Sequence, residues 1–74
     1  MIEQYNGYNF EIQLHDEKKR IVCWKMIDAV NEAMWQEETD IFTTEISSEK
    51  KDYIINKCEK AIKKFKKKAV EENQ

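Results

Sequence analysis

Alternation of apolar and polar residues marks the beginning of the chain. From Tyr8 to His15 every second residue is apolar, namely Tyr8, Phe10, Ile12 and Leu14. This is the period of a half-buried β-strand. Asn6-Gly7 stands just before it, and Asn-Gly is a strong hairpin signal because both central residues of a type I′ turn need positive φ. The pattern predicts an N-terminal hairpin in which Tyr5 pairs with Tyr8.

Residues 15–38 admit two interpretations. In the first, residues 15–19 form a turn, residues 20–24 a third strand and residues 25–37 a helix. In the second, Asp16 caps one helix that continues to Glu38. The segment 21–24, Ile-Val-Cys-Trp, is apolar on every side and rich in strand-favouring residues, which favours the first interpretation.

Three further elements follow from the first interpretation. The helix 25–37 would carry one apolar side, formed by Met26, Ile27, Ala29, Val30, Ala33 and Met34, with Trp35 on its polar side. Residues 39–46 are dense in β-branched and aromatic residues, which indicates another short strand. Ser47 or Ser48 then caps a helix with a long apolar stripe, formed by Ile54, Ile55, Cys58, Ala61, Ile62, Phe65 and Ala69.

These elements predict an α+β fold in a single domain, residues 1–70, with a frayed tail at 71–74. It would contain an N-terminal β-hairpin, three to four antiparallel strands in all and two helices, the long amphipathic C-terminal helix packing on the sheet. Residues 5–12, Tyr-Asn-Gly-Tyr-Asn-Phe-Glu-Ile, and the lysine-rich C-terminus resemble short open reading frames of bacterial mobile elements. That resemblance implies no function.

The size of the chain limits its stability. A domain of 74 residues buries a small core, so a partner or a second copy would help to stabilise it. Its two cysteines, Cys23 and Cys58, form no disulfide framework, and we expect reduced thiols packed in the core. We find no leader-like segment and no apolar run of bilayer length, and therefore expect a cytoplasmic protein.

No motif for catalysis or for a cofactor is evident. One glycine cannot form a phosphate-binding loop. Cys23, His15 and Asp16 could be written as a nucleophilic set, but burial in an apolar run would remove the reactive thiolate. His15, Cys23 and Cys58 provide only three zinc ligands, without a close-spaced pair. We expect no catalytic residues, no metal and no cofactor.

Charge is divided unequally along the chain. Residues 1–47 hold ten acids and four bases, whereas residues 48–74 hold nine lysines and five acids. Six acids and no base occur from Asp28 to Glu45. Because exposed tryptophan is enriched at the centres of protein interfaces, we predict an acidic partner-binding surface around Trp35. Its residues are Asp28, Glu32, Trp35, Glu37, Glu38 and Asp40.

The C-terminal helix offers an alternative surface. Four lysines share one flank of this helix with an aromatic residue, and such a flank can bind phosphate chains. The residues are Tyr53, Lys57, Lys60, Lys64 and Lys67. Lysines beside an apolar stripe also simply keep a helix soluble.

The function predicted from these patterns is that of a small, non-enzymatic protein-interaction module, an accessory or inhibitor-type protein. Its partner would be another protein, with self-association into a homo-oligomer also expected and no membrane binding. The alternative function is binding of nucleic acid or another anionic ligand through the lysine flank.

Overall fold

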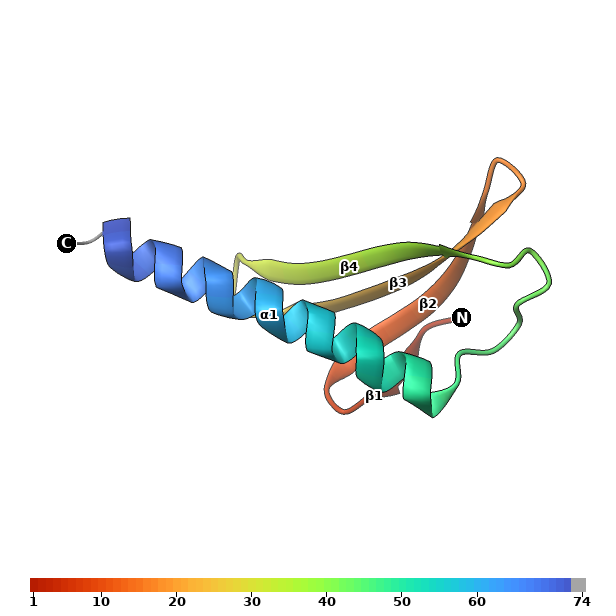
Figure 1. Ribbon diagram of the computed structural model, residues 1–74, viewed down its shortest axis with the longest axis horizontal. Helices are drawn as coiled ribbons and strands as arrows, with labels where there is room; N and C mark the ends of the chain where they lie inside the picture. Colours follow the sequence, from red (N-terminus) through yellow and green to blue (C-terminus); the bar gives the residue numbers. More distant parts are fainter. Residues whose placement is uncertain (73–74) are drawn as a thin grey trace.

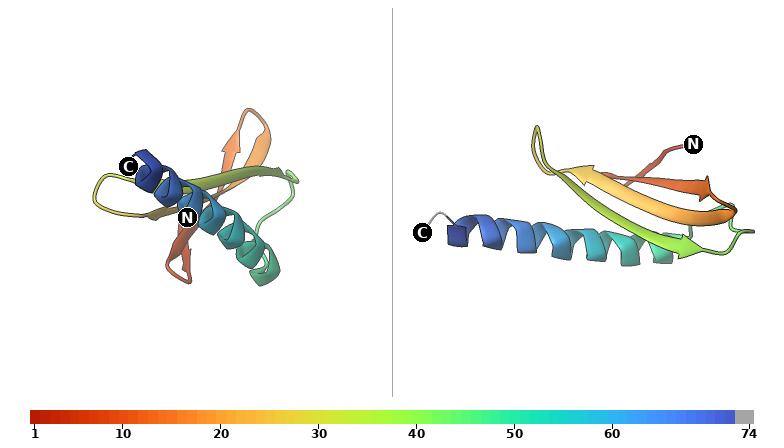
Figure 2. Two further views of the ribbon diagram at one scale, coloured as in Figure 1. Left: turned by 60° about the vertical axis from the view of Figure 1, so that its left-hand side comes forward. Right: turned by 90° about the horizontal axis from the view of Figure 1, so that it is seen from above.

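The computed structural model describes the backbone of residues 1–72 and the side chains of residues 1–64. Four antiparallel strands form one sheet in the order β1-β2-β3-β4, and a single helix lies across one of its faces (Figures 1 and 2). The elements are β1 (Glu3–Tyr5), β2 (Tyr8–His15), β3 (Lys18–Met26), β4 (Glu32–Thr39) and α1 (Ser48–Glu72). The predicted α+β class is confirmed, with four strands but only one helix among the described residues.

The N-terminal hairpin forms as predicted. Tyr5 pairs with Tyr8, and the two turn residues between them have positive φ, 49° at Asn6 and 82° at Gly7. Glycine adopts this backbone conformation without steric cost, and asparagine tolerates it. The hairpin therefore fixes the register of β1 on β2.

The third strand is also confirmed, and it is longer than expected. β3 pairs with β2 from His15↔Lys18 to Asn9↔Trp24. A two-residue turn joins the strands, with Asp16 and Glu17 at φ 51° and 64°. The alternative of one long helix beginning at Asp16 is therefore wrong.

The helix predicted over residues 25–37 is wrong, because β3 continues to Met26 and β4 begins at Glu32. The intervening turn is closed by the Ile27 N–H, which donates to the Asn31 carbonyl at 2.8 Å. Asp28 Oδ1 accepts the backbone N–H groups of Val30 and Asn31, both at 2.9 Å. An aspartate side chain that satisfies its own backbone replaces the glycine or proline that such a turn usually contains.

The strand predicted over residues 39–46 is wrong as well. β4 ends at Thr39, and residues 40–47 form an irregular connection to α1. Asp40 Oδ1 accepts the Phe42 N–H at 2.7 Å, and the Asp40 carbonyl accepts the Thr43 N–H at 3.0 Å. This tight local turn diverts the chain from the sheet despite its β-branched composition.

The C-terminal helix is confirmed, and it packs on the sheet. Ser47 Oγ accepts the Lys50 N–H at 3.2 Å, as an N-cap does. Of the tail predicted at 71–74, residues 71 and 72 belong to α1 and residues 73–74 lie outside the described part of the chain. No helix within the described residues has the length and apolar character needed to cross a bilayer.

The core lies between α1 and the sheet. Phe10, Cys23, Ile54 and Cys58 are completely buried, and Cys58 Sγ of the helix lies 3.5 Å from Cys23 Sγ of β3. Both cysteines are free thiols in the core, as expected. The other members of the buried cluster are Tyr8, Ile21 and Ile46, with Tyr5, Ile12, Trp35 and Ile55 packed against it.

Polar contacts attach α1 to β1 at one edge of the sheet. The Tyr5 hydroxyl donates to Asp52 Oδ1 at 3.0 Å, and Lys51 forms an ion pair with Glu3. The hydrogen bond to Asp52 is the main cause that raises the pKa of Tyr5, and burial adds to it. The N-terminal turns of α1 are therefore fixed over the hairpin.

Candidate functional site

The face of the sheet opposite α1 carries an apolar stripe that no other element of the described chain covers. Strand alternation directs four apolar side chains of β3 and β4 to this side, because their neighbours Cys23 and Trp35 face α1. We call this surface the open-face stripe; it comprises Val22, which is only 4% exposed, and the more accessible Trp24, Met26 and Met34. Met26 and Met34 are 50% and 45% exposed, and Trp24 is partly exposed beside Met34, its register partner.

Polar side chains surround the open-face stripe. Glu32 and Glu38 of β4 point to the same side, opposite Met26 and Arg20 in the register. Glu11 of β2 pairs with Val22 and accepts a hydrogen bond from Gln13 at 2.8 Å. The only ion pair that Glu38 forms among the described side chains is with Lys18, at 3.8 Å, and both groups are exposed. The rim therefore combines the carboxylates of Glu11, Glu32 and Glu38 with the cations of Lys18 and Arg20, which lie beside Glu38.

The structure divides the predicted acidic surface between three places. Glu32 and Glu38 lie on the open face, whereas Trp35 and Glu37 alternate with them and face α1. Asp28 and Asp40 lie in the turns on either side of β4, where their carboxylates accept backbone N–H groups. Hydrogen bonding, first to the Asn31 side chain and then to backbone N–H groups, lowers the pKa of Asp28. Only two of the six residues therefore border the open-face stripe.

Trp35 is half-buried and packs against the core rather than standing on the polar side of a helix. Lys57 Nζ lies 5.8 Å from the centroid of its ring, within the range of a cation–π interaction. Its indole N–H donates to Glu37 at 3.4 Å, and Glu37 forms an ion pair with Lys50. Trp35 thus connects β4 to α1.

The lysine flank follows the side of α1 nearest to β4. Tyr53 is 48% exposed, and Lys50 Nζ and Lys57 Nζ lie over its ring, at 5.1 and 5.2 Å from its centroid. Lys60 and Lys64 are exposed, and the Lys67 side chain lies outside the described residues. Basic α1 therefore lies against acidic β4, so that charges separated in the sequence are neighbours in space.

The candidate nucleophile lacks the required environment. Burial raises the pKa of Cys23 to about 12, and the adjacent Cys58 thiol contributes. His15 lies at the β2–β3 turn, 3.3 Å from Asp16, whereas Cys23 pairs with Phe10 near the other end of β2. No cluster of three metal-ligating side chains occurs among the side chains described.

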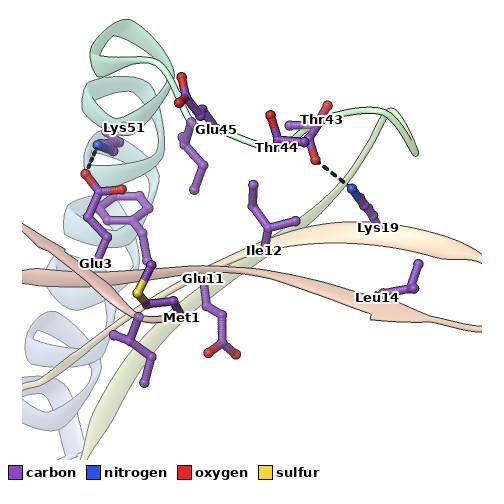
Figure 3. A pocket seen from close by; sticks show the side chains of 13 residues that line it. Met1, Glu3, Glu11, Ile12, Leu14, Lys19, Thr43, Thr44, Glu45 and Lys51 are labelled. Carbon is purple, nitrogen blue, oxygen red and sulfur yellow. Dashed lines mark hydrogen bonds and ion pairs between the residues drawn. The ribbon is translucent and has the colours of Figure 1, made fainter.

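A groove lies on the helix side of the sheet, where α1 does not reach the end of β2 (Figure 3). Its volume is about 770 Å³. Phe10, Ile12 and Leu14 of β2 contribute one wall, and residues 43–46 of the connection to α1 contribute another. Lys19 crosses one end and donates to the Thr43 carbonyl at 2.8 Å. Leu14 is 66% exposed at the margin of this groove.

The sequence contained a signal for the open-face stripe. Val22, Trp24 and Met26 occupy every second position of one segment. The residues between them are Cys23, which is apolar, and Lys25, which has a long aliphatic stem. A strand that is apolar on both sides is expected between two covering layers. In the structure α1 supplies one of these layers, and no described element supplies the other.

Comparison of the chain with protein-family models, with curated proteins and with solved structures finds no match.

Proposed function

We propose that this protein is a non-enzymatic interaction module that binds a protein partner through the open face of its sheet. The observation that carries the proposal is the open-face stripe, with Trp24 and Met34 side by side on a face that α1 leaves uncovered. Contiguous exposed apolar surface with a polar rim is characteristic of protein-binding sites. Tryptophan and methionine are also enriched in interfaces relative to the remaining surface.

The rim indicates the chemistry of the partner. Glu32 and Glu38 border the stripe on β4, and Glu11 borders it on β2. An apolar centre favours apolar side chains on the partner, and the carboxylates of Glu11 and Glu32 favour lysine or arginine near them, whereas Lys18 and Arg20 balance the charge of Glu38 at the other end of the stripe. Electrostatic attraction would then accelerate encounter, and burial of Trp24 would provide much of the affinity.

The proposal that the module is not an enzyme rests on its thiols and its polar clusters. Cys23 remains protonated near neutral pH because its pKa is raised to about 12. Asp28 and Asp40 accept backbone N–H groups in turns, Glu37 pairs with Lys50, and Asp52 on α1 accepts the Tyr5 hydroxyl. A general acid and base instead need carboxylates in unlike environments within one cleft.

The test is affinity capture from lysate of the source cell on immobilised protein, followed by mass spectrometry. The open-face variant is Trp24→Thr/Met34→Thr, which keeps strand-favouring residues. The matched control is Lys60→Gln/Lys64→Gln on exposed positions of α1. We expect the proteins captured by the wild type to be retained by the control and lost by the open-face variant, with unchanged circular dichroism. Retention by both variants would contradict the proposal.

A second candidate function is binding of nucleic acid through the lysine flank. It is supported by the exposure of Tyr53 beside Lys50 and Lys57, since a base that displaces a lysine from this ring could stack on it while the lysines contact phosphates. A heparin or nucleic-acid column separates the two candidates, because phosphate binding weakens steeply with salt. Retention that Lys60→Gln/Lys64→Gln abolishes, with Trp24→Thr/Met34→Thr unaffected, would favour this second function.

A further inference from the structure

The two edge strands of the sheet differ in length: β4 pairs with β3 over its eight residues, whereas the short β1 leaves part of β2 without a partner. β1 has three residues and pairs only with Tyr8 to Phe10, whereas β2 continues to His15. Residues 11–15 of β2 therefore have no neighbouring strand on that side within the described part of the chain. Met1 and Ile2 precede β1 and lie outside the sheet; they are exposed and line the same groove as Ile12 and Leu14, so they must stay clear of the edge for a further strand to pair there.

Backbone alternation identifies the free hydrogen-bonding groups of this edge. In a two-residue hairpin the residues next to the turn, Tyr5 and Tyr8, exchange both backbone hydrogen bonds. Every second residue of β2 after Tyr8 then points its N–H and C=O to the edge on which β1 lies. Ile12 and Leu14 consequently present unpaired backbone groups at the free edge, and their side chains line the groove (Figure 3).

We propose that two copies of this chain pair through residues 11–15 of β2, antiparallel and about a two-fold axis at Gln13. This register places Ile12 opposite Leu14 of the second copy, so that the free backbone groups of both residues are satisfied. A shift by two residues toward the N-terminus would bring the second copy onto Glu3 of β1, which pairs with Phe10. A shift toward the C-terminus would leave fewer paired residues.

The side chains of this edge are self-complementary in the proposed register. Glu11 would lie opposite His15 of the second copy, a carboxylate facing an imidazole that can donate a hydrogen bond. On the helix side, Leu14 of each copy would cover Ile12 of the other over the groove. This contact would remove the most exposed apolar side chain of β2, Leu14 at 66%, from water. The neutral Gln13 side chains would face each other at the axis.

The other edge of the sheet opposes the same kind of pairing. The outward backbone groups of β4 belong to Glu32, Met34, Gln36 and Glu38, since the alternate residues bond to β3. Antiparallel pairing of two whole β4 strands would place Glu32 opposite Glu38 of the second copy. Charged side chains on an edge strand are a recognised protection against such pairing. The five paired residues of β2 place no two acids opposite each other, which favours this edge over β4; the nearest acids, Asp16 and Glu3 of the second copy, lie just outside the paired segment.

Pairing of five residues gives a small interface, so the association is expected to be weak and dependent on concentration. A covalent trap is therefore the suitable test. Residues directly opposite at a non-hydrogen-bonded position have Cα atoms about 4.5 Å apart, within the range that a disulfide bridges. Gln13→Cys should form a disulfide-linked dimer under mild oxidation. Cys23 and Cys58 do not interfere, because both are completely buried.

The matched control is Gln36→Cys, an exposed glutamine on β4 that also points to the open face. We expect Gln13→Cys to cross-link roughly tenfold faster or more, because pairing raises the effective thiol concentration. Adding Leu14→Lys to Gln13→Cys should reduce cross-linking to the control rate; Leu14 is exposed, so the fold should be retained. Equal rates for both cysteines, no covalent dimer, or indifference to Leu14→Lys would each overturn the proposal. The open-face stripe stays uncovered in this dimer. Failure of partner capture would therefore not contradict the dimer, and failure of dimer formation would not contradict the proposed function.

Discussion

The two faces of the sheet are formed by the same strands, but α1 covers only one of them. On the side of α1, Phe10 and Cys23 are completely buried beneath Ile54 and Cys58. On the opposite side, Trp24 and the two neighbouring methionines of the open-face stripe remain accessible. An antiparallel sheet with one wet face normally alternates strictly between apolar and polar residues, and β3 breaks this rule.

This difference separates stability from recognition. Apolar burial, the largest favourable contribution to folding, is concentrated on the covered face. The open-face stripe contributes less, because its methionines retain about half of their exposure. Substitutions on the two faces should therefore have different consequences, and this comparison can be tested by mutation.

The largest expected effect is that of Phe10→Ala. Truncation of a fully buried phenylalanine destabilises a protein by roughly 3–5 kcal/mol, which is comparable with the whole stability of so small a domain. We expect the variant to be largely unfolded in urea titrations followed by circular dichroism. Met34→Ala on the open face should cost only about 1 kcal/mol. Similar losses for both variants would show that the two faces do not differ as described.

A smaller effect is expected for Cys58→Ser, which replaces a buried thiol beside Cys23 by a hydroxyl. We expect a loss of roughly 1–2 kcal/mol in the free energy of unfolding, because a buried hydroxyl needs a hydrogen-bond partner. Native alkylation with mass spectrometry should leave both thiols unmodified until the protein unfolds, since neither is exposed. A Cys23–Cys58 disulfide in freshly purified protein would be the contrary result.

The same thiols should make the covered face sensitive to alkaline pH. The pKa of Cys23 rises from 9.0 to about 12 on folding, so above pH 9 the unfolded chain loses a proton that the folded chain retains. Stability is therefore complete below pH 9 and decreases as the pH rises toward 12. One pH unit above the unfolded pKa the loss is about 1.4 kcal/mol. Urea titrations at pH 8 and 10 should show that Cys23→Ala loses less stability over this interval than the wild type.

Local signals made the N-terminal hairpin and α1 predictable. Asn6-Gly7 determines its turn without help from distant residues, and the stripe on α1 extends over many helical turns. The sequence predicts a helix over residues 25–37, which include most of β4, because Ala33 and Met34 are adjacent apolar residues and are compatible with a helical stripe. In the structure they lie on opposite faces of the sheet. The turn before β4 contains neither glycine nor proline and depends on the side chain of Asp28.

The candidate site could be predicted only in part, for a related reason. Whether Trp24 or Trp35 is accessible depends on whether residues 32–39 form a helix or a strand. With a second helix over residues 25–37, Trp35 would stand on a polar surface, as expected from the sequence. As part of β4 it faces α1, and Trp24, one position out of phase across the register, faces solvent. The wrong helix prediction for residues 25–37 therefore exchanges the two tryptophans, because it makes Trp35, rather than Trp24, the exposed one.

The smallest expected effect concerns the charged margin between α1 and β4. Lys50 pairs with Glu37, but the lysine side chain is 42% exposed, so that water and salt screen the interaction. Lys50→Gln should therefore lower the free energy of unfolding by less than about 1 kcal/mol, and by less still at high salt. Thermal unfolding at low and high ionic strength measures both quantities, with Lys60→Gln as the control because Lys60 forms no ion pair among the described side chains. A loss as large as that of Phe10→Ala would mean that charge, rather than apolar burial, holds α1 on the covered face.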